Sequence, residues 1–332
     1  MEHTLIPWLQ QRAYRQILPL ADANTLLHCW PLLEPLAQDA AWLPPVVIPA
    51  GEIHKNLHTC THIWQAMLDA RLDRKALVVN LGGGVVGDMG GFCAATWKRG
   101  IDFIQIPTTL LSMTDAAIGG KLGIDFQQVK NTIGVFRQPA AVFADTRFLK
   151  TLPARELLSG FAEVIKHALI GAPDLWHTIR EHGHTGSLRY DAFDWPALLE
   201  SSVAVKHRVV QEDPYEKDLR MVLNYGHTIG HAVESYFLNT ETPVTHGEAV
   251  AFGMVAESRI AYPPGQRLER IETTIAQYFD PLHVPESIYP ALWEAMLQDK
   301  KNQGGKVRMT VPGNLPFSYE IHELEWPLSG LG

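Results

Sequence analysis

Three histidines in the second half of the chain could hold a metal ion. His227 and His231 lie in the stretch RMVLNYGHTIGH, and His246 follows in THGEAVAFGM. Residues four apart on a helix differ by about 40° in direction, so His227 and His231 would share one helix face. Neutral imidazole is a common ligand of divalent transition metals. The pattern fits ordinary helix-face histidines equally well, and Thr228 stands where a zinc protease carries its glutamate base.

The segment FAEVIKHALI adds a carboxylate to these candidates. Glu163, Lys166 and His167 fall at positions i, i+3 and i+4, on one side of an otherwise apolar helix. With His227 and His246, Glu163 would complete a set of two imidazoles and one carboxylate, which suits a catalytic zinc site with open positions. The alternative is an ordinary ion pair between Glu163 and Lys166.

Cations gather in segments marked by glycine or asparagine, although the chain carries a formal net charge of −8. Such a group predicts a local pocket for phosphate or carboxylate, while any single one of them also suits a solvated surface. The net charge argues against a general nucleic-acid binder, which needs a basic footprint. The cations are Arg99, Lys121, Lys130, Lys166, Lys206, Arg220, Lys300 and Lys301.

The composition indicates a globular chain large enough for two domains. It has 332 residues, of which 46% are hydrophobic and 19% charged. The three cysteines are scattered and form no CxxC pair, which favours a reducing compartment over a disulfide framework or a thiolate zinc site. No apolar run approaches the roughly 18 residues of a membrane span, and the N-terminus lacks the pattern of a signal peptide. We therefore expect a soluble, cytoplasmic protein that binds neither nucleic acid nor membrane.

The first half of the chain alternates predicted strands with predicted helices. The helices are expected at residues 23–36 and from residue 51 to about 71. The run ALVVNL reads as a buried parallel strand and leads into GGGVVGD, which matches GxGxxG through Gly82, Gly84 and Gly87. A glycine turn opening a helix lets a pyrophosphate approach backbone N–H groups, although close helix–sheet packing would also explain the glycines. The strands are expected at residues 15–20, 45–49, 76–81, 101–107 and 141–144.

Two features depart from the usual dinucleotide-binding fingerprint. The glycines lie some 80 residues into the chain, and the acid about twenty residues further on, Asp102, begins a predicted strand. From residue 155 to about 298 the apolar spacing is almost wholly helical, and a strand is expected at 306–311. The sequence thus predicts an α/β domain over residues 1–147 and a mostly helical domain over 148–332.

The motifs taken together resemble the 3-dehydroquinate synthases of the sugar-phosphate cyclase family. They run in family order from about residue 50 to 310, whereas the first 45 residues match poorly. The matching stretches are GEIHK, GGGVVGD, KRGIDFIQIPTTLLSMTDAAIGGK, KNTIGVFRQP, FLKTLP, SGFAEVIKHALI, LRMVLNYGHTIGH, THGEAVAFGM and DKKNQGGK.

The resemblance implies an N-terminal NAD domain, a C-terminal metal domain, and three metal ligands for Zn²⁺ or Co²⁺: Glu163, His227 and His246. Family NAD-contacting positions fall on Glu52, Lys55, Gly83, Gly84, Asp88, Thr108, Thr109, Asp115, Lys121, Lys130, Phe148 and Thr151. Family substrate positions fall on Asp115, Lys121, Lys130, Asn131, Lys166, Lys206, Arg220, Asn224, His231, Lys300 and Lys301. Arg99 matches a residue that reaches the partner subunit's site, which implies a homodimer.

The implied reaction turns 3-deoxy-D-arabino-heptulosonate 7-phosphate (DAHP) into 3-dehydroquinate and phosphate, a step of the shikimate pathway toward chorismate and the aromatic amino acids. NAD would act as a hydride carrier without net turnover, and the metal as a Lewis acid. The stretch LGIDFQQVKN departs from the family pattern at Leu122, Asp125 and Val129, which leaves the conformation of this loop open.

The sequence leaves three alternatives. One is a related cyclase acting on another sugar phosphate, although His231 and the lysine of GGK favour the dehydroquinate activity. Another is a metal-dependent NAD polyol dehydrogenase of the same plan, which would not need the dense group of cations. The third is a binding protein that has lost catalysis, which the intact Glu163, His227 and His246 argue against.

Overall fold

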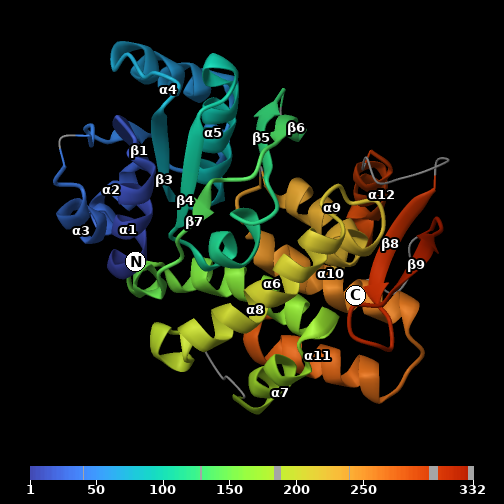
Figure 1. The fold of residues 1–332 in the computed structure, drawn as a ribbon. Helices are drawn as coiled ribbons and strands as arrows, with labels where there is room; N and C mark the ends of the chain where they lie inside the picture. The colour runs from blue at the N-terminus through green and yellow to red at the C-terminus, as the bar shows by residue number, and fades with distance from the viewer. Residues whose placement is uncertain (40, 128, 183–187, 239, 299–305, 328–332) are drawn as a thin grey trace. The chain divides into compact units, whose positions relative to one another are not determined.

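The computed structural model describes residues 1–39, 41–127, 129–182, 188–238, 240–298 and 306–327. The chain divides into two compact units, Met1–Leu152 (unit 1) and Pro153–Gly332 (unit 2) (Figure 1). The boundary predicted after residue 147 falls within the 3₁₀ helix η5 (Thr146–Thr151).

Unit 1 is built on a parallel five-stranded sheet with the strand order β2-β1-β3-β4-β7. All five predicted strands are present, and β3 is buried along its whole length, as its apolar run predicted. Because the strands are parallel, their carboxyl ends lie at one edge of the sheet, where Gly82 pairs with Pro107. The strands are β1 (Gln16–Asp22), β2 (Val46–Ile48), β3 (Ala76–Gly82), β4 (Asp102–Pro107) and β7 (Ala141–Val142).

Helices α4 (Leu57–Asp69) and α5 (Gly84–Thr96) cover one face of this sheet. Ile63 and Met67 of α4 and Met89 of α5 join the strand side chains in one buried core. Helix α5 lies very close to β3, because a Cβ atom on Gly90 would come 1.9 Å from Oδ1 of Asn80. Gly90 of α5 therefore serves the packing of this helix against β3.

Two predicted helices are shorter than expected. The helix expected over residues 23–36 is divided into α2 (Ala23–His28), α3 (Trp30–Leu33) and the 3₁₀ helix η1 (Glu34–Leu36), because Pro31 lacks the N–H that a continuous helix needs. The helix expected from residue 51 begins only at Leu57. There Asn56 caps it by accepting the Thr59 N–H at 3.1 Å, while η2 (Glu52–His54) precedes it.

A β-hairpin that the sequence did not predict follows β4. Strands β5 (Lys121–Phe126) and β6 (Val129–Phe136) pair antiparallel, with an irregularity in register between Ile124 and Phe126. The rest of unit 1 comprises α1 (Glu2–Arg12), η3 (Trp97–Arg99) and η4 (Ser112–Ala116).

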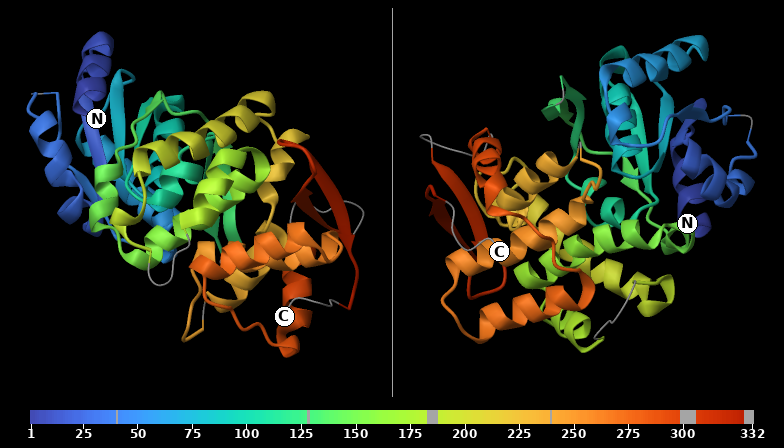
Figure 2. Two further views of the ribbon diagram at one scale, coloured as in Figure 1. Left: turned by 90° about the horizontal axis from the view of Figure 1, so that it is seen from below. Right: turned by 180° about the vertical axis from the view of Figure 1, so that it is seen from behind.

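Unit 2 is mostly helical, as predicted. One hydrophobic core of this unit joins α9 and α12 to the hairpin β8–β9, through Val233, Leu292 and Met309. Figure 2 shows this hairpin from two further sides; its first strand was predicted and its second was not. The elements are α6 (Ala154–Gly171), α7 (Pro173–His182), η6 (Tyr190–Ala192), α8 (Trp195–Glu212), η7 (Leu219–Asn224), α9 (His227–Phe237), α10 (His246–Ala261), α11 (Gln266–Tyr278), η8 (Glu286–Ile288), α12 (Tyr289–Leu297), β8 (Val307–Pro312) and β9 (Tyr319–Leu324).

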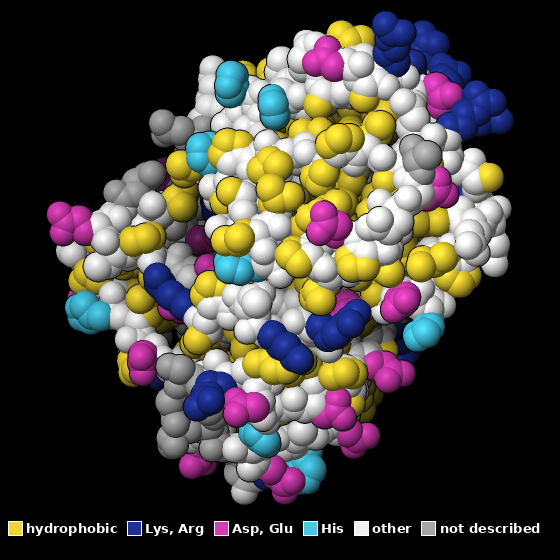
Figure 3. All heavy atoms as spheres, turned by 90° about the vertical axis from the view of Figure 1, so that its left-hand side faces the viewer, with side chains coloured by type: hydrophobic (Ala, Val, Ile, Leu, Met, Phe, Trp, Pro, Cys, Tyr) yellow, Lys and Arg dark blue, Asp and Glu magenta, His cyan; other side chains and the backbone are white. Residues whose placement is uncertain are grey.

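The surface drawn in Figure 3 carries basic side chains in a few small groups among acidic and apolar ones. This distribution agrees with the net charge of −8. Among the helices that the structure describes, none has the length and apolar character needed to span a bilayer.

Candidate metal centre and nucleotide site

The three predicted metal ligands come together in unit 2 from three different helices. Glu163 lies within α6, while His227 and His246 are the first residues of α9 and α10. One donor atom from each lies within 4.8 Å of the others. Oε1 of Glu163 is 3.4 Å from Nε2 of His227 and 3.2 Å from Nε2 of His246. Two imidazole nitrogens and one carboxylate oxygen fit a divalent transition metal with open coordination positions.

Backbone contacts between the three helices explain why these side chains meet. A Cβ atom on Gly253 of α10 would lie 2.0 Å from the carbonyl oxygen of Gly226, and one on Gly247 would lie 2.1 Å from that of Ser159. The Gly247 N–H also donates to Ser159 Oγ at 2.9 Å. Because only glycine permits these approaches, α10 packs closely against both α6 and the start of α9.

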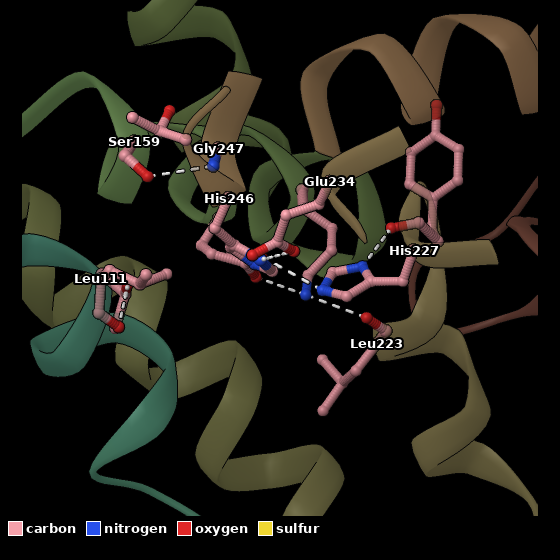
Figure 4. A network of polar contacts seen from close by, with 12 residues as sticks. Leu111, Ser159, Leu223, His227, Glu234, His246 and Gly247 are labelled. Atoms are coloured by element: carbon pink, nitrogen blue, oxygen red, sulfur yellow. Dashed lines mark hydrogen bonds and ion pairs between the residues drawn. The ribbon is translucent and has the colours of Figure 1, made fainter. Parts of the chain in front are cut away.

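Hydrogen bonds orient both imidazoles. Nδ1 of His227 lies 3.0 Å from the carbonyl oxygen of Tyr225, which can only accept, so this nitrogen carries the proton. Nδ1 of His246 lies 3.2 Å from Oε2 of Glu234. Figure 4 shows His227, Glu234 and His246 directed toward one another. Each ring thereby turns Nε2 toward Glu163, the arrangement by which outer hydrogen bonds orient metal-binding histidines.

Sequence reasoning did not identify Glu234. It lies seven residues after His227 on the same helix, but nothing local indicated that His246 would stand beside it.

The carboxylate of Glu163 is buried and holds its charge. Its neighbour Lys166, 1% exposed as a side chain, forms an ion pair with it and donates to the carbonyl oxygen of Leu223 at 2.9 Å. Burial raises the pKa of Glu163, but Lys166 and His227 outweigh this and hold the pKa well below its usual range. The two interpretations of this helix face, an ion pair of Glu163 with Lys166 and a metal ligand at Glu163, are therefore compatible.

The two histidines of the set differ in protonation. Burial, together with Lys166, lowers the pKa of His227 to about 4. Burial also lowers the pKa of His246, but the carboxylates of Glu163 and Glu234 outweigh it and raise the pKa to about 10. His227 is therefore neutral and ready to bind an ion, whereas an ion would have to displace a proton from His246.

His231 lies beside His227, as the helical spacing predicted, but belongs to another group of donors. Its ring centroid is 4.9 Å from that of His227 and 5.8 Å from that of His246. One donor atom each of His231, Glu234 and His246 lie within 4.8 Å of one another, and Glu163 does not belong to this second group.

Three predicted cations of unit 2 have buried side chains, which is unusual for lysine and arginine. Lys166, Lys206 and Arg220 are each at most 5% exposed. Arg220 Nη1 donates to the carbonyl oxygen of Pro214 at 2.7 Å, and Nδ2 of Asn224 donates to Oε1 of Glu216 at 2.8 Å. The predicted pair Lys300 and Lys301 lies outside the described residues.

In unit 1 the glycine turn stands where it was predicted, between β3 and α5. Gly83 precedes the first turn of α5 with φ −74° and ψ −168°, values that any residue adopts, so its lack of a side chain matters for space. A Cβ atom there would lie 3.1 Å from Thr109, and one on Gly84 would lie 3.4 Å from Cβ of Ala116. The Thr108 N–H donates to the Gly82 carbonyl at 3.1 Å. The first N–H groups of a helix have no partner within the helix, so the start of α5 suits a phosphate.

Lys55 forms a largely buried ion pair with Asp88 of α5. Nζ of Lys55, whose side chain is 5% exposed, is 2.6 Å from Oδ2 of Asp88 and 3.9 Å from Oε1 of Glu52. Burial raises the pKa of Asp88 to about 6 although Lys55 opposes this. The carboxylates of Asp88 and Glu52 outweigh the burial of Lys55 and raise its pKa. Three predicted NAD-contacting side chains therefore share one cluster.

In the β5–β6 hairpin, Asn131 lies beside Lys55. Lys55 Nζ donates to Asn131 Oδ1 at 2.7 Å, and the Asn131 N–H donates to Oδ1 of Asp125 at 2.8 Å. Asn131 has φ +52°, so the Asp125 carboxylate supports a left-handed backbone. Leu122 is a buried core residue and Val129 begins β6 at the surface. The hairpin thus holds Asn131 next to Lys55 although Leu122, Asp125 and Val129 depart from the family pattern.

The other predicted residues of unit 1 are more dispersed. Arg99 is exposed with φ +70°, and its neighbours Lys98 and Gly100 also have positive φ, so the turn holds a strained backbone. Asp115 lies half-buried in η4, Lys121 is exposed at the start of β5, and Lys130 is half-buried on β6. Phe148 is buried in η5, where its carbonyl accepts from Oγ1 of Thr151 at 3.3 Å.

We expect Lys55→Met to destabilise the protein by about 3 kcal/mol at pH 8, because it leaves the Asp88 carboxylate buried without its cation. The pKa of Asp88 is about 6, above the 3.8 of an ordinary aspartate, so its ionisation already costs stability as the pH rises from about 4 to 6. Without Lys55 the pKa of Asp88 rises further, so its ionisation at pH 8 lowers the stability of the folded protein by more. At pH 5 Asp88 is mostly protonated in both proteins, so the difference should shrink to about 1 kcal/mol or less.

Urea unfolding of NAD-free protein at the two pH values measures this effect. Lys75→Met, at an exposed lysine of the same unit, is the control and should change stability little at either pH. If Lys55→Met lowers the free energy of unfolding equally at pH 5 and pH 8, the lost stability does not come from the charge of Asp88, which would contradict this prediction.

Comparison with known proteins gives a consistent result for both units. Residues 45–159 match the family model "3-dehydroquinate synthase N-terminal", and residues 160–302 match "3-dehydroquinate synthase C-terminal". The 3-dehydroquinate synthase of Parabacteroides distasonis is 40% identical over 321 residues, covering 95% of this chain and 89% of that protein. That of Synechococcus sp. is 47% identical over 318 residues, covering 93% and 86%.

Solved structures of similar fold include more distant enzymes. ValA, a 2-epi-5-epi-valiolone synthase from Streptomyces hygroscopicus subsp. jinggangensis solved with NAD⁺ and Zn²⁺ bound, is 26% identical with a TM-score of 0.81, covering 99% of this chain and 91% of that one. Glycerol dehydrogenase from Schizosaccharomyces pombe is 16% identical with a TM-score of 0.57, covering 88% and 79%. The latter likeness concerns the fold alone.

Proposed function

The chain belongs to the 3-dehydroquinate synthase family of enzymes, and from this premise we propose which of its residues perform the reaction. That reaction converts DAHP into 3-dehydroquinate and phosphate. The observation that carries the assignment of residues is the convergence of Glu163, His227 and His246 in unit 2.

Glu163, His227 and His246 hold one divalent ion, Zn²⁺ or Co²⁺, which supplies a Lewis acid for a substrate hydroxyl when bound. Lys166 sits beside Glu163 and keeps that carboxylate ionised before the ion arrives. Glu234 orients His246 through Nδ1. These roles use contacts within unit 2 only.

The buried cations of unit 2 hold the negative groups of the substrate. DAHP carries a carboxylate and a phosphate, and each needs donors in a fixed geometry while bonds are broken and formed. Lys206, Arg220 and Asn224 donate to these groups, together with Lys166. His231 donates to the leaving phosphate. We also assign Lys300 and Lys301, which lie outside the described residues, to the negative groups of the substrate.

The turn between β3 and α5 binds NAD, which supplies a hydride acceptor and donor when bound. The N–H groups of Gly83 and Gly84 face the pyrophosphate at the helix start. Supporting contacts come from Glu52, Lys55, Asp88, Thr108, Thr109, Phe148 and Thr151. Asp115, Lys121, Lys130 and Asn131 of the same unit contact the cofactor or the substrate.

Replacing Gly84 with valine should abolish NAD binding, because the new side chain occupies the space through which the pyrophosphate reaches the N–H groups. Gly84→Ala is the informative companion: its Cβ would lie 3.4 Å from Ala116, an ordinary contact, so the protein should fold normally but bind NAD more weakly. Calorimetric titration with NAD⁺ and thermal unfolding measure the two properties. Wild-type NAD affinity in both variants would refute the placement.

The choice of substrate follows from the degree of similarity. Relatives that are 40% and 47% identical over most of the chain are 3-dehydroquinate synthases, whereas ValA is 26% identical. DAHP should therefore release phosphate, while sedoheptulose 7-phosphate and glucose 6-phosphate, which lack the carboxylate, should not. A glycerol-type alcohol should not cause NADH to accumulate, as it would with a polyol dehydrogenase.

We further propose a cytoplasmic homodimer in which Arg99 donates to phosphate in the partner subunit's site. Arg99→Ala and Lys166→Ala should then each be nearly inactive. When equal amounts of the two variants are unfolded and refolded together, they should recover about a quarter of wild-type activity, because half of the dimers are mixed and each mixed dimer holds one intact site. A fully active monomer by light scattering, or no recovery of activity in a mixture that has refolded to dimers, would contradict this role.

A further inference from the structure

Helix α10 carries a buried carboxylate, Glu257, which is 0% exposed and lies against the start of α9. Its Oε2 accepts the N–H of Gly226 at 2.7 Å, and its Oε1 accepts the N–H of Ile229 at 3.0 Å. Gly226 precedes the first residue of α9, and Ile229 is the third residue. The first N–H groups of a helix have no partner within the helix, so Glu257 provides the cap from a neighbouring element.

The start of α9 cannot supply this cap itself. Gly226 has no side chain and adopts φ +76°. A Cβ atom there would lie 2.6 Å from Cγ of Met254 and 2.8 Å from the Val250 carbonyl oxygen. Serine or aspartate, the usual capping residues, therefore does not fit at this position. A buried carboxylate is well suited instead, because the N-terminal end of a helix favours negative charge and its bonds to N–H groups are charge-assisted.

The capped turn is the one that carries His227. The Nδ1 of His227 bonds to the carbonyl oxygen of Tyr225. The hydroxyl of Tyr225 in turn lies 2.6 Å from Oγ of Ser258 and donates to the carbonyl oxygen of Met254 at 3.1 Å. The residue whose carbonyl orients His227 and the backbone turn that carries His227 are thus both hydrogen-bonded to residues 254–258 of α10.

We propose that Glu257 is a positioning residue for the metal centre. It holds the first turn of α9 in the one placement that directs Nε2 of His227 toward Oε1 of Glu163, 3.4 Å away. Helix α10 thereby contributes twice, with His246 as a ligand at its first residue and Glu257 about three turns later. Glu257 itself touches neither ion nor substrate, and the inference rests on the metal site proposed above.

A purely structural role for Glu257 would give a different result. Loss of the cap would then lower the stability of unit 2 and leave the affinity for an ion unchanged. A positioning role requires that metal affinity and the ligand field of the ion change as well. Outer hydrogen-bond partners of metal sites typically contribute 10- to 100-fold in metal affinity.

The test uses the full chain with Co²⁺ as the probe. Competition titration against a chelator gives the Kd, and the visible absorption of bound Co²⁺ reports its coordination geometry. Glu257→Ala should weaken Co²⁺ binding about 10- to 100-fold and alter the spectrum. Glu257→Gln keeps one acceptor but faces the second N–H with its own NH₂ group, so it should weaken binding by a smaller factor.

Tyr278→Phe is the matched control. The Tyr278 hydroxyl on α11 donates to the carbonyl oxygen of Ile179 at 2.6 Å, so this variant loses a buried hydrogen bond in the same unit. It should lower the unfolding temperature while Co²⁺ affinity and spectrum stay as in the wild type.

Wild-type Co²⁺ affinity and spectrum in Glu257→Ala would overturn the inference. If that variant does not fold, wild-type affinity in Glu257→Gln would overturn it equally. A wild-type protein that binds no Co²⁺ would instead refute the metal site, and the inference with it.

Discussion

Replacing His227 with alanine is expected to empty the metal site and to slow turnover about a hundred- to a thousandfold. The variant loses one of three donors that lie within 4.8 Å of one another. Lewis-acid polarisation is worth several kcal/mol, and each 1.36 kcal/mol corresponds to a tenfold change in rate. Metal analysis of the purified protein and an assay of phosphate release from DAHP measure the two effects.

His231→Ala is the contrasting variant on the same helix face. It should retain nearly one metal ion per chain, because Glu163, His227 and His246 remain. Its turnover should fall about ten- to a hundredfold, since one charge-assisted hydrogen bond to the leaving phosphate is worth about 1.5–3 kcal/mol. If His231→Ala is purified without metal, the donors of His231, Glu234 and His246 form the real site, and the assigned role of His231 is wrong.

Lys166→Met should destabilise the metal-free protein by about 3–5 kcal/mol, the usual loss when one partner of a buried ion pair is removed. Both side chains are at most 1% exposed, so water cannot take the place of the lost cation beside Glu163. Saturating Co²⁺ should narrow the gap to the wild type, because the bound ion supplies positive charge to the same carboxylate. An ion at a hundred times its Kd stabilises the folded state by about 2.7 kcal/mol.

Urea unfolding with and without Co²⁺ measures these differences. Arg155→Met is the control. Arg155 is 55% exposed in its ion pair with Glu248, 2.8 Å away, and its loss should cost about 1 kcal/mol or less. A gap for Lys166→Met that Co²⁺ does not narrow would indicate that the ion does not bind next to Glu163.

Local spacing was enough to predict part of the site. The helical period placed His227 and His231 side by side, and apolar runs ending in glycine predicted β3 and the turn before α5. Residue types alone suggested the set of Glu163, His227 and His246, but their long spacing could not establish that Glu163 meets His246. That meeting depends on backbone contacts such as that of Gly253 with Gly226. No local rule of spacing records such contacts.

Other elements were missed for identifiable reasons. The β5–β6 hairpin has an irregular register and much of β6 is exposed, so its sequence lacks a regular apolar alternation. Strand β9 carries several charged residues and buries only Leu324 fully. The partnership of Asp125 with Asn131 depends on a left-handed residue inside this hairpin, which the sequence pattern does not indicate.

The most direct test of the proposed function is phosphate release from DAHP by the full chain, with NAD⁺ and Zn²⁺ present and NADH absorbance followed at the same time. We expect one phosphate and one 3-dehydroquinate for each DAHP consumed, no accumulation of NADH, and loss of activity on chelation that Zn²⁺ or Co²⁺ reverses. Metal-loaded protein that releases no phosphate from DAHP, or that accumulates NADH in proportion to substrate, would contradict the account.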